Sequence, residues 1–217
     1  MSPDYSSISK RAKHIDIPIR LPTSGKVTDL VIDATGLKVY GEGEWKVKKH
    51  GADKRRTWRK LHLAVDPKSH DIVAAKLTLD NVGDPTVFPE LMANSPDSIK
   101  TVYADGAYDT RECYDLLIKK GITACIPPRK NAISWDEVHP RSQAVNQIEQ
   151  TSRKQWKQTS GYHRRSIAEN AMYRVKQLLS AKLTLRHYDN QVTEIMAGLR
   201  AINKMNSLGM PVRNVRA

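Results

Sequence analysis

Short segments in which apolar positions alternate with polar ones, or follow one another without interruption, recur through the first half of the chain and predict β-strands. Turn-forming residues separate them, for example at residues 41–43 and 66–71. No helical pattern comes between the first three segments, so they are expected to form an antiparallel meander. The expected strands cover residues 28–40, 58–65, 72–79, 99–104 and 122–126.

Apolar positions spaced three or four residues apart predict the helices, most of them in the second half of the chain. Asp84 and Pro85 are typical of an N-cap and of the first residue of a helix, here one that ends near residue 92. Gly121 is typical of the position just after a helix. Further helices are expected over residues 6–14, 110–120, 162–180 and 191–208.

The order of these elements predicts an α/β fold in which helices flank a mixed five-stranded sheet. Strands that follow a helix are expected to join the meander in parallel. Residues 127–158 are polar and interrupted by prolines, so they predict a loop-like insertion with some helix near residues 143–154. The 217 residues suffice for one domain with a substantial core. The expected division is a polar N-terminal linker at 1–26, a main domain at 27–208 with its insertion at about 127–160, and a tail at 209–217.

The chain has a large excess of positive charge, with 36 Lys and Arg residues against 23 Asp and Glu and a formal net charge of +13. Such an excess favours a polyanionic partner, most simply nucleic acid. The sequence has no apolar run of about 18 residues, no long amphipathic stretch with aromatic anchors and no signal-peptide core, so no membrane association is expected. Cys113 and Cys125 lack the spacing of a metal or redox motif, which suits buried thiols in a cytoplasmic protein.

The densest basic segment follows the first expected strand. Eight of the 16 positions from 45 to 60 are Lys or Arg, and Trp45, His50 and Trp58 are interleaved with them. Two interpretations are open, because charged residues protect exposed sheet edges and also bind phosphates. The single sign of the charge favours phosphate contact. The candidate DNA-binding residues in this segment are Lys46, Lys48, Lys49, Arg55 and Arg56.

Asp33 interrupts the strongest apolar run, Leu-Val-Ile-Asp-Ala at residues 30–34. Burying an unpaired carboxylate is unfavourable, so this side chain is expected to be paired, to cap a turn or to hold a cation. Asp105 follows the fourth expected strand, and Glu169 lies in the last expected helix but one. Three acids carried by two strands and a helix would form a site for a divalent metal ion, which is the working hypothesis.

The helix that carries Glu169 presents a polar stripe beside its apolar face. At about 100° per residue, four of its polar side chains fall within an arc of about 60°, namely Tyr162, Arg165, Glu169 and Lys176. Other interpretations remain open. Ser166 and Glu169 have the spacing of a capping box, and a charged stripe is also typical of a solvated helix face.

The spacing Y-x2-R-x3-E-x6-K over residues 162–176 matches the Y-R-E-K signature of DDE transposases from bacterial insertion sequences. The segments Val-Ile-Asp-Ala-Thr-Gly around Asp33 and Tyr-Ala-Asp-Gly-Ala-Tyr-Asp around Asp105 resemble the two blocks that carry the catalytic aspartates of that family. The blocks occur in the family's order. The resemblance extends from about residue 3 to residue 208.

This resemblance implies an RNase H-like fold in which the two aspartates and Glu169 jointly bind two Mg²⁺ ions, for which Mn²⁺ can substitute. It also implies that Tyr162, Arg165 and Lys176 contact DNA phosphates near the cleaved bond. The implied activity is cleavage of double-stranded DNA at transposon ends and strand transfer into a target. The resemblance further implies that the protein acts as a dimer and is associated with the nucleoid.

Three further residues leave alternatives open. Some members of this family carry a base-stacking aromatic residue in an insertion before the glutamate, and Trp135 and Trp156 lie in the corresponding region, although packing in the core is the simpler interpretation. His62 lies on an expected strand, where it would either approach the acids or fill a structural role.

Transposases of this group usually have an N-terminal helical domain that recognises the terminal repeats of the element, whereas only residues 1–26 precede the expected core here. The chain is therefore expected to be an N-terminally truncated transposase. One open function is a catalytic domain that cleaves DNA, and another is a catalytically silent fragment that binds DNA or inhibits full-length transposase. The signature disfavours a ribonuclease H-type hydrolase on the same fold.

Overall fold

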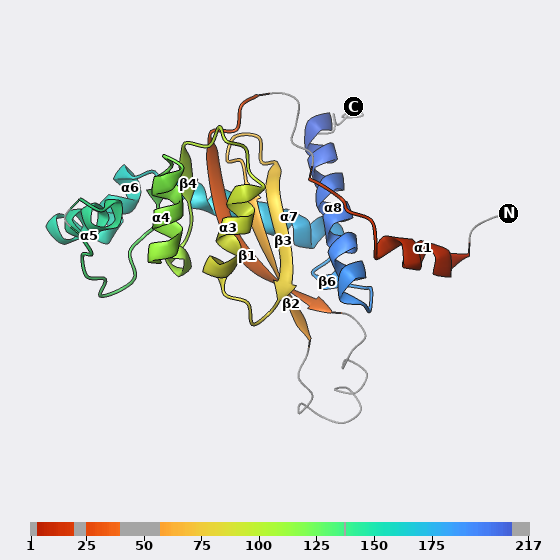
Figure 1. Ribbon diagram of the computed structural model, residues 1–217. Helices are drawn as coiled ribbons and strands as arrows, with labels where there is room; N and C mark the ends of the chain where they lie inside the picture. Colours follow the sequence, from red (N-terminus) through yellow and green to blue (C-terminus); the bar gives the residue numbers. More distant parts are fainter. Residues whose placement is uncertain (1–3, 20–24, 40–56, 137, 210–217) are drawn as a thin grey trace, which may run out of the picture.

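A mixed β-sheet lies at the centre of the computed structural model, which describes residues 4–19, 25–39, 57–136 and 138–209. The strand order is β3-β2-β1-β4-β5 (Figure 1). Neighbours among β1, β2 and β3 are antiparallel, whereas β4 pairs with β1, and β5 with β4, in parallel. The strands are β1 (Asp29–Val39), β2 (Trp58–Val65), β3 (Ile72–Leu79), β4 (Thr101–Tyr103), β5 (Thr123–Cys125) and β6 (Lys182–Leu183).

The strand topology confirms the expected antiparallel meander with parallel additions, which is the RNase H-like arrangement. The bounds of β2 and β3 agree with those predicted from the alternating pattern. All five predicted strands are present, and β6 adds a sixth, unpredicted strand that pairs in parallel with the end of β1. Its two residues are too few to show an alternating pattern in the sequence.

Helices cover both faces of the sheet (Figure 1). Helices α3 (Asp84–Ala93) and α4 (Arg111–Lys119) pack on one face, and α7 (Ser166–Leu179) and α8 (Tyr188–Leu208) pack on the other. Helix α1 (Tyr5–Ala12) extends outward past α8, while α5 (Pro140–Gln150) and α6 (Arg153–Thr159) lie at the opposite end, beyond β4 and α4. None of the helices in the described part of the chain combines the length and the apolar character that crossing a bilayer requires.

The alternation of side chains along β1 builds the core on both sides of the sheet. Leu30 and Ile32 are fully buried against α3 and α4. Val31 points to the other face, where it packs with Ala168 of α7. The same alternation places Asp33 on the face that α7 covers.

Two predicted details of the helices were wrong. Asp84 is the first residue of α3 rather than its N-cap, which is Gly83, and the Asp84 carboxylate instead pairs with Lys60 of β2 at 2.7 Å. The helix expected near residues 143–154 of the insertion is present, but the rest is less loop-like than predicted, because α5 and α6 together cover most of residues 140–159. His139 and Ser152 cap these two helices by accepting hydrogen bonds from backbone N–H groups.

The segment that carries the polar stripe also differs from the expected single helix. The turn η2 (Tyr162–Arg165) is a 3-10 helix, and the α-helix begins only at Ser166. The angular spacing of an α-helix therefore does not apply to Tyr162. The expected capping box is absent, since Arg165 is the N-cap and no side chain caps it. Ser166 instead donates its hydroxyl hydrogen to the carbonyl of His163.

Candidate active site

Asp33 lies within β1, and only 13% of its side chain is exposed. Its Oδ1 accepts a hydrogen bond from the backbone N–H of Ala34 at 2.8 Å, and its Oδ2 accepts one from Nη2 of Arg165 at 2.8 Å. Burial raises the pKa of this carboxyl above its ordinary value, although both donors oppose that effect. Of the three roles expected for Asp33, the structure shows the paired one.

Asp105 follows β4 and opens the 3-10 turn η1 (Gly106–Tyr108). Its Oδ1 accepts a hydrogen bond from the backbone N–H of Ala107 at 2.9 Å. The register of the parallel strands, in which Val31 lies opposite Tyr103, places Asp105, just beyond the end of β4, level with Asp33 inside β1. The other oxygen, Oδ2, lies 4.0 Å from Nη2 of Arg165. One oxygen of Asp105 therefore fixes the turn, and the other lies near the guanidinium of Arg165.

Glu169 approaches the same point from the first turn of α7, with 57% of its side chain exposed. Its Oε1 accepts a hydrogen bond from Nη1 of Arg165 at 2.7 Å. A single guanidinium thus lies within 4.0 Å of Asp33, Asp105 and Glu169. Burial acts to lower the pKa of Arg165, but the three acids hold it above its ordinary value. Arg165 is the cation around which the three carboxylates gather.

The other members of the polar stripe are less closely engaged. The ring of Tyr162 packs against Trp156, with 6.0 Å between ring centroids, and the ammonium of Lys157 lies 5.3 Å from its centre. Burial raises the pKa of the Tyr162 hydroxyl above its ordinary value. Lys176 lies two turns beyond Glu169 and forms no ion pair with any described residue. Lys46, Lys48, Lys49, Arg55 and Arg56 lie outside the described residues.

The donor set suits a hard divalent cation, because all three side chains offer carboxylate oxygens. Within the described ranges, however, no three His, Cys, Asp or Glu side chains lie close enough together to hold a metal ion. The acids are instead spaced around the guanidinium of Arg165. The chemistry of the donors therefore fits a divalent ion, whereas the three side chains are spaced in this structure around Arg165.

Arg164 is a candidate that the sequence pattern did not single out. It lies beside Arg165 on η2, its Nη1 is 3.7 Å from Oδ1 of Asp29, and 46% of its side chain is exposed. Its guanidinium also lies 5.8 Å from the ring centre of Tyr103. The run His-Arg-Arg at residues 163–165 is the signal that could have pointed to it.

His62 has a structural environment. Its ring is fully buried on β2, Nε2 lies 3.0 Å from the hydroxyl of Thr78, and Nδ1 lies 3.4 Å from Oδ1 of Asp84. Burial lowers its pKa to about 4. His62 is therefore neutral near pH 7 and makes no hydrogen bond or ion pair with Asp33 or Glu169.

The two tryptophans of the insertion are packing residues in this structure. Trp156 is 4% exposed and packs with Tyr162, Val31 and Ala168. Trp135 is partly buried, and the guanidinium of Arg141 lies 4.1 Å from its ring centre. The simpler of the two interpretations, packing, describes both rings.

Comparisons with known proteins place these observations in a family context. A family model described as "Transposase DDE domain" matches residues 25–204, and a second model with the same description matches residues 1–42. Among solved structures, the chain resembles a piggyBac transposase in a synaptic complex with hairpin DNA, determined by cryo-EM, at a TM-score of 0.45 and 12% sequence identity. That match covers 86% of this chain and 49% of the piggyBac chain, so this chain spans about half the length of that protein.

Proposed function

The chain belongs to the DDE transposase family, as the sequence resemblance predicted, and on that premise we propose that it carries out metal-dependent cleavage and strand transfer of double-stranded DNA. Asp33, Asp105 and Glu169 are the proposed catalytic residues and ligands of two Mg²⁺ or Mn²⁺ ions. The observation that carries the proposal is the meeting of these acids, from β1, the end of β4 and α7, around one guanidinium.

Metal ions bound there would supply activation of a water or a DNA 3′-hydroxyl and would stabilise the leaving 3′-oxygen of an in-line displacement. The protein's own residues supply binding and orientation. Arg165 presents a planar fork that suits a phosphate as well as it suits a carboxylate, so an incoming phosphate can draw it away from Asp33 and Glu169. Lys176, which has no ion-pair partner among the described residues, adds a point charge farther along α7, and Tyr162 adds a hydroxyl donor.

The proposed assignment to regions follows from the same premise. Residues 27–208 form the catalytic domain, with the insertion at about 127–160 between the second aspartate and Glu169. Residues 1–26 form a linker, and residues 209–217 a tail. Transposon ends and target DNA are the proposed substrates, a second copy or a full-length transposase is the proposed protein partner, and the nucleoid is the proposed location.

A second candidate function is a catalytically silent protein that binds DNA, or inhibits an active transposase, without turnover. The ion pairs that Arg165 makes with Asp33 and Glu169 favour it, since carboxylates that stay paired with Arg165 are not free to bind metal ions. The two functions differ in whether DNA is cleaved, so one assay separates them.

The deciding experiment is nicking of a supercoiled plasmid in the presence of Mg²⁺ or Mn²⁺. We expect nicking by the parent chain and a loss of at least about 100-fold in each of Asp33→Ala, Asp105→Ala and Glu169→Gln, because each removes a metal ligand. Glu90→Gln is the matched control, since Glu90 lies on α3 and pairs with Lys76 on the opposite face of the sheet. A parent that binds DNA without nicking it would favour the catalytically silent function, and nicking by all three variants would rule out the proposed site.

A further inference from the structure

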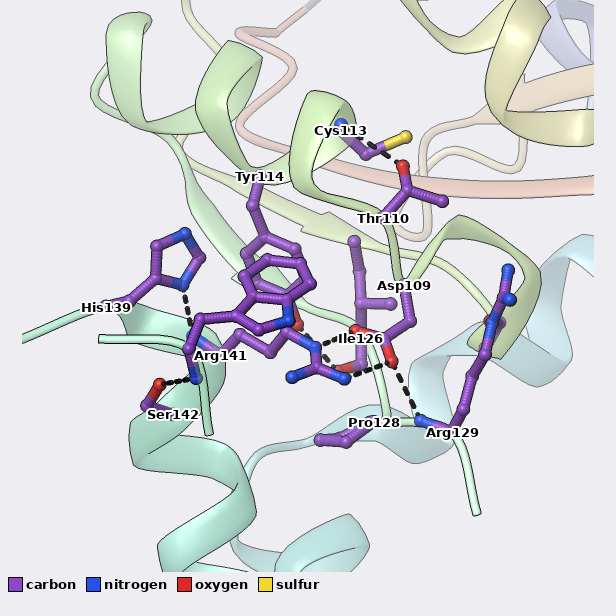
Figure 2. Close-up of polar contacts among 12 residues, drawn as sticks. Asp109, Thr110, Cys113, Tyr114, Ile126, Pro128, Arg129, His139, Arg141 and Ser142 are labelled. Atoms are coloured by element: carbon purple, nitrogen blue, oxygen red, sulfur yellow. Dashed lines mark hydrogen bonds and ion pairs between the residues drawn. The ribbon is translucent and has the colours of Figure 1, made fainter. Parts of the chain in front are cut away.

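Hydrogen bonds and an ion pair connect the insertion to the turn that begins with Asp105. Figure 2 shows Asp109, the residue that follows η1, between Arg141 of α5 and Arg129 of the segment that leads into the insertion. The Asp109 side chain has 0% exposure and the Arg141 side chain 6%. These residues lie outside the group formed by the three acids and Arg165, but the peptide chain connects Asp109 to Asp105 through a single 3-10 turn.

Arg141 forms a bidentate ion pair with Asp109. Its Nε donates to Oδ1 at 2.5 Å and its Nη2 donates to Oδ2 at 3.0 Å. The remaining nitrogen, Nη1, donates to the carbonyl of Ile133 at 2.6 Å, and Trp135 covers the guanidinium. Burying a charged pair is favourable only when its geometry and its remaining hydrogen bonds are satisfied, as they are here.

Arg129 holds the same turn at both ends. Its backbone N–H donates to Oδ2 of Asp109 at 2.9 Å. Its side chain donates from Nε to the carbonyl of Gly106 at 3.1 Å and from Nη2 to the carbonyl of Ala107 at 3.2 Å. One arginine therefore spans the turn from Gly106 to Asp109.

Within the turn, the position of the backbone sets the direction of the Asp105 carboxylate. The N–H of Ala107 binds Oδ1 of Asp105, and the carbonyl of the same Ala107 is the acceptor for Arg129. The N–H of Tyr108 closes the turn by donating to the carbonyl of Asp105 at 3.1 Å. A shift of Asp109 or Arg129 is therefore transmitted to Asp105 through one or two peptide groups.

We propose that Arg129, Asp109 and Arg141 are positioning residues for Asp105, and that the insertion serves to orient this acid. The inference deepens the proposed function and rests on it, because the direction of Oδ2 matters there for metal binding. Partners that orient metal ligands are worth about 10 to 100-fold in metal affinity in other metalloproteins. Packing of α5 and α6 against the core would by itself require apolar contacts, not a buried carboxylate of the turn paired with an arginine of α5.

The test compares Arg129→Ala and Asp109→Asn with the parent chain. The Arg129 side chain is exposed, so its removal leaves the core intact, whereas Asp109→Asn leaves a buried arginine without its charge partner. Ser142→Ala is the matched control. Ser142 lies on α5 and accepts a hydrogen bond from the N–H of Trp135, and no hydrogen bond connects it to the turn.

Two measurements are made on each folded variant. Isothermal titration gives the Mn²⁺ dissociation constant, and hydrogen–deuterium exchange gives the protection of the amides of residues 107–109. We expect Arg129→Ala to weaken Mn²⁺ binding by about 10-fold and to speed exchange in the turn. Binding of DNA in the presence of EDTA is expected to change by less than about twofold, and Ser142→Ala is expected to match the parent in both measurements.

The outcomes separate this inference from the proposed function. Unchanged Mn²⁺ affinity and unchanged exchange in Arg129→Ala would overturn it, as would an equal effect of Ser142→Ala. A parent chain that does not bind Mn²⁺ would count against the proposed function, and the exchange rates alone would then decide whether Arg129 orders the turn. Should Asp109→Asn fail to fold, the comparison of Arg129→Ala with Ser142→Ala decides the question.

Discussion

Arg165 shows how one side chain can keep a cluster of acids stable before any ligand arrives. Two of its nitrogens donate to Asp33 and Glu169, and the third acid, Asp105, lies within 4.0 Å. Without a cation between them, carboxylates so placed would repel one another, and burial already raises the pKa of Asp33. The same arrangement makes Arg165 a competitor of any divalent ion for these oxygens.

Replacing Arg165 with glutamine is expected to destabilise the metal-free protein by about 1.5 to 3 kcal/mol, the usual range for hydrogen bonds to charged groups. Mn²⁺ is expected to raise the melting temperature of this variant more than that of the parent, because the ion then binds without displacing a guanidinium. Differential scanning fluorimetry with and without Mn²⁺ measures both effects. Arg174→Gln is the control on the same helix, where Arg174 donates to Asn206. Equal Mn²⁺ shifts in the parent and in Arg165→Gln would contradict the competition.

At the scale of elements, the contact between α3 and β2 includes a buried titratable group, His62. Asp84, the first residue of α3, pairs with Lys60 and approaches Nδ1 of His62, both from β2. The pKa of His62 is lowered to about 4 by burial, whereas an unfolded histidine titrates near 6.5. The unfolded chain therefore binds more protons than the folded one between these two values, and the stability of the fold falls as the pH falls through that window.

This linkage predicts a pH-dependent difference between the parent and His62→Gln. Between pH 7.5 and pH 4, the parent is expected to lose about 3 kcal/mol more of its free energy of unfolding than the variant, since 1 pKa unit corresponds to about 1.4 kcal/mol. Urea unfolding at several pH values measures the free energy of unfolding of both proteins. The contributions of acids that both proteins share cancel when the two values are subtracted. A parent–variant difference that stays constant from pH 7.5 to pH 4 would show that His62 is protonated equally in both states.

The elements that could be predicted from the sequence are those whose burial sets their pattern. β2 and β3 are apolar over most of their length because helices cover both faces of the sheet. Gly121, with its positive φ, follows the C-cap of α4. In the insertion only some helix near residues 143–154 could be predicted, because α5 and α6 are polar and α5 is fixed by a contact between Asp109 and Arg141, which lie 32 residues apart. The site was predictable only in part. Residue types and spacing pointed to the three acids, but they gave no indication that Arg165 would bind all of them from a 3-10 turn.

At the scale of the whole molecule, the net charge of +13 is the feature that bears most directly on a partner. Fixed positive charge attracts DNA over a distance of about 10 Å at moderate salt, whatever its sequence. Net charge alone does not say where the DNA lies, however. Described basic side chains gather near the acids on η2, namely Arg164 and Arg165, and at the far end of α4, namely Lys119 and Lys120.

Salt dependence of DNA binding distinguishes true phosphate contacts from general attraction. Replacing Lys46, Lys48, Lys49, Arg55 and Arg56 with glutamine is expected to lower the slope of log Kobs against log salt concentration by about 0.9 for each phosphate contact that is lost. The control replaces five exposed basic residues of α1, α4 and their ends, namely Lys10, Arg11, Lys13, Lys119 and Lys120. Each variant lowers the formal net charge by five, so a difference in slope reports contacts rather than charge. Equal salt slopes in the two variants would indicate that the segment from 45 to 60 protects a sheet edge and does not bind DNA. A larger decrease of the salt slope in the first variant than in the control would indicate that DNA phosphates contact this segment.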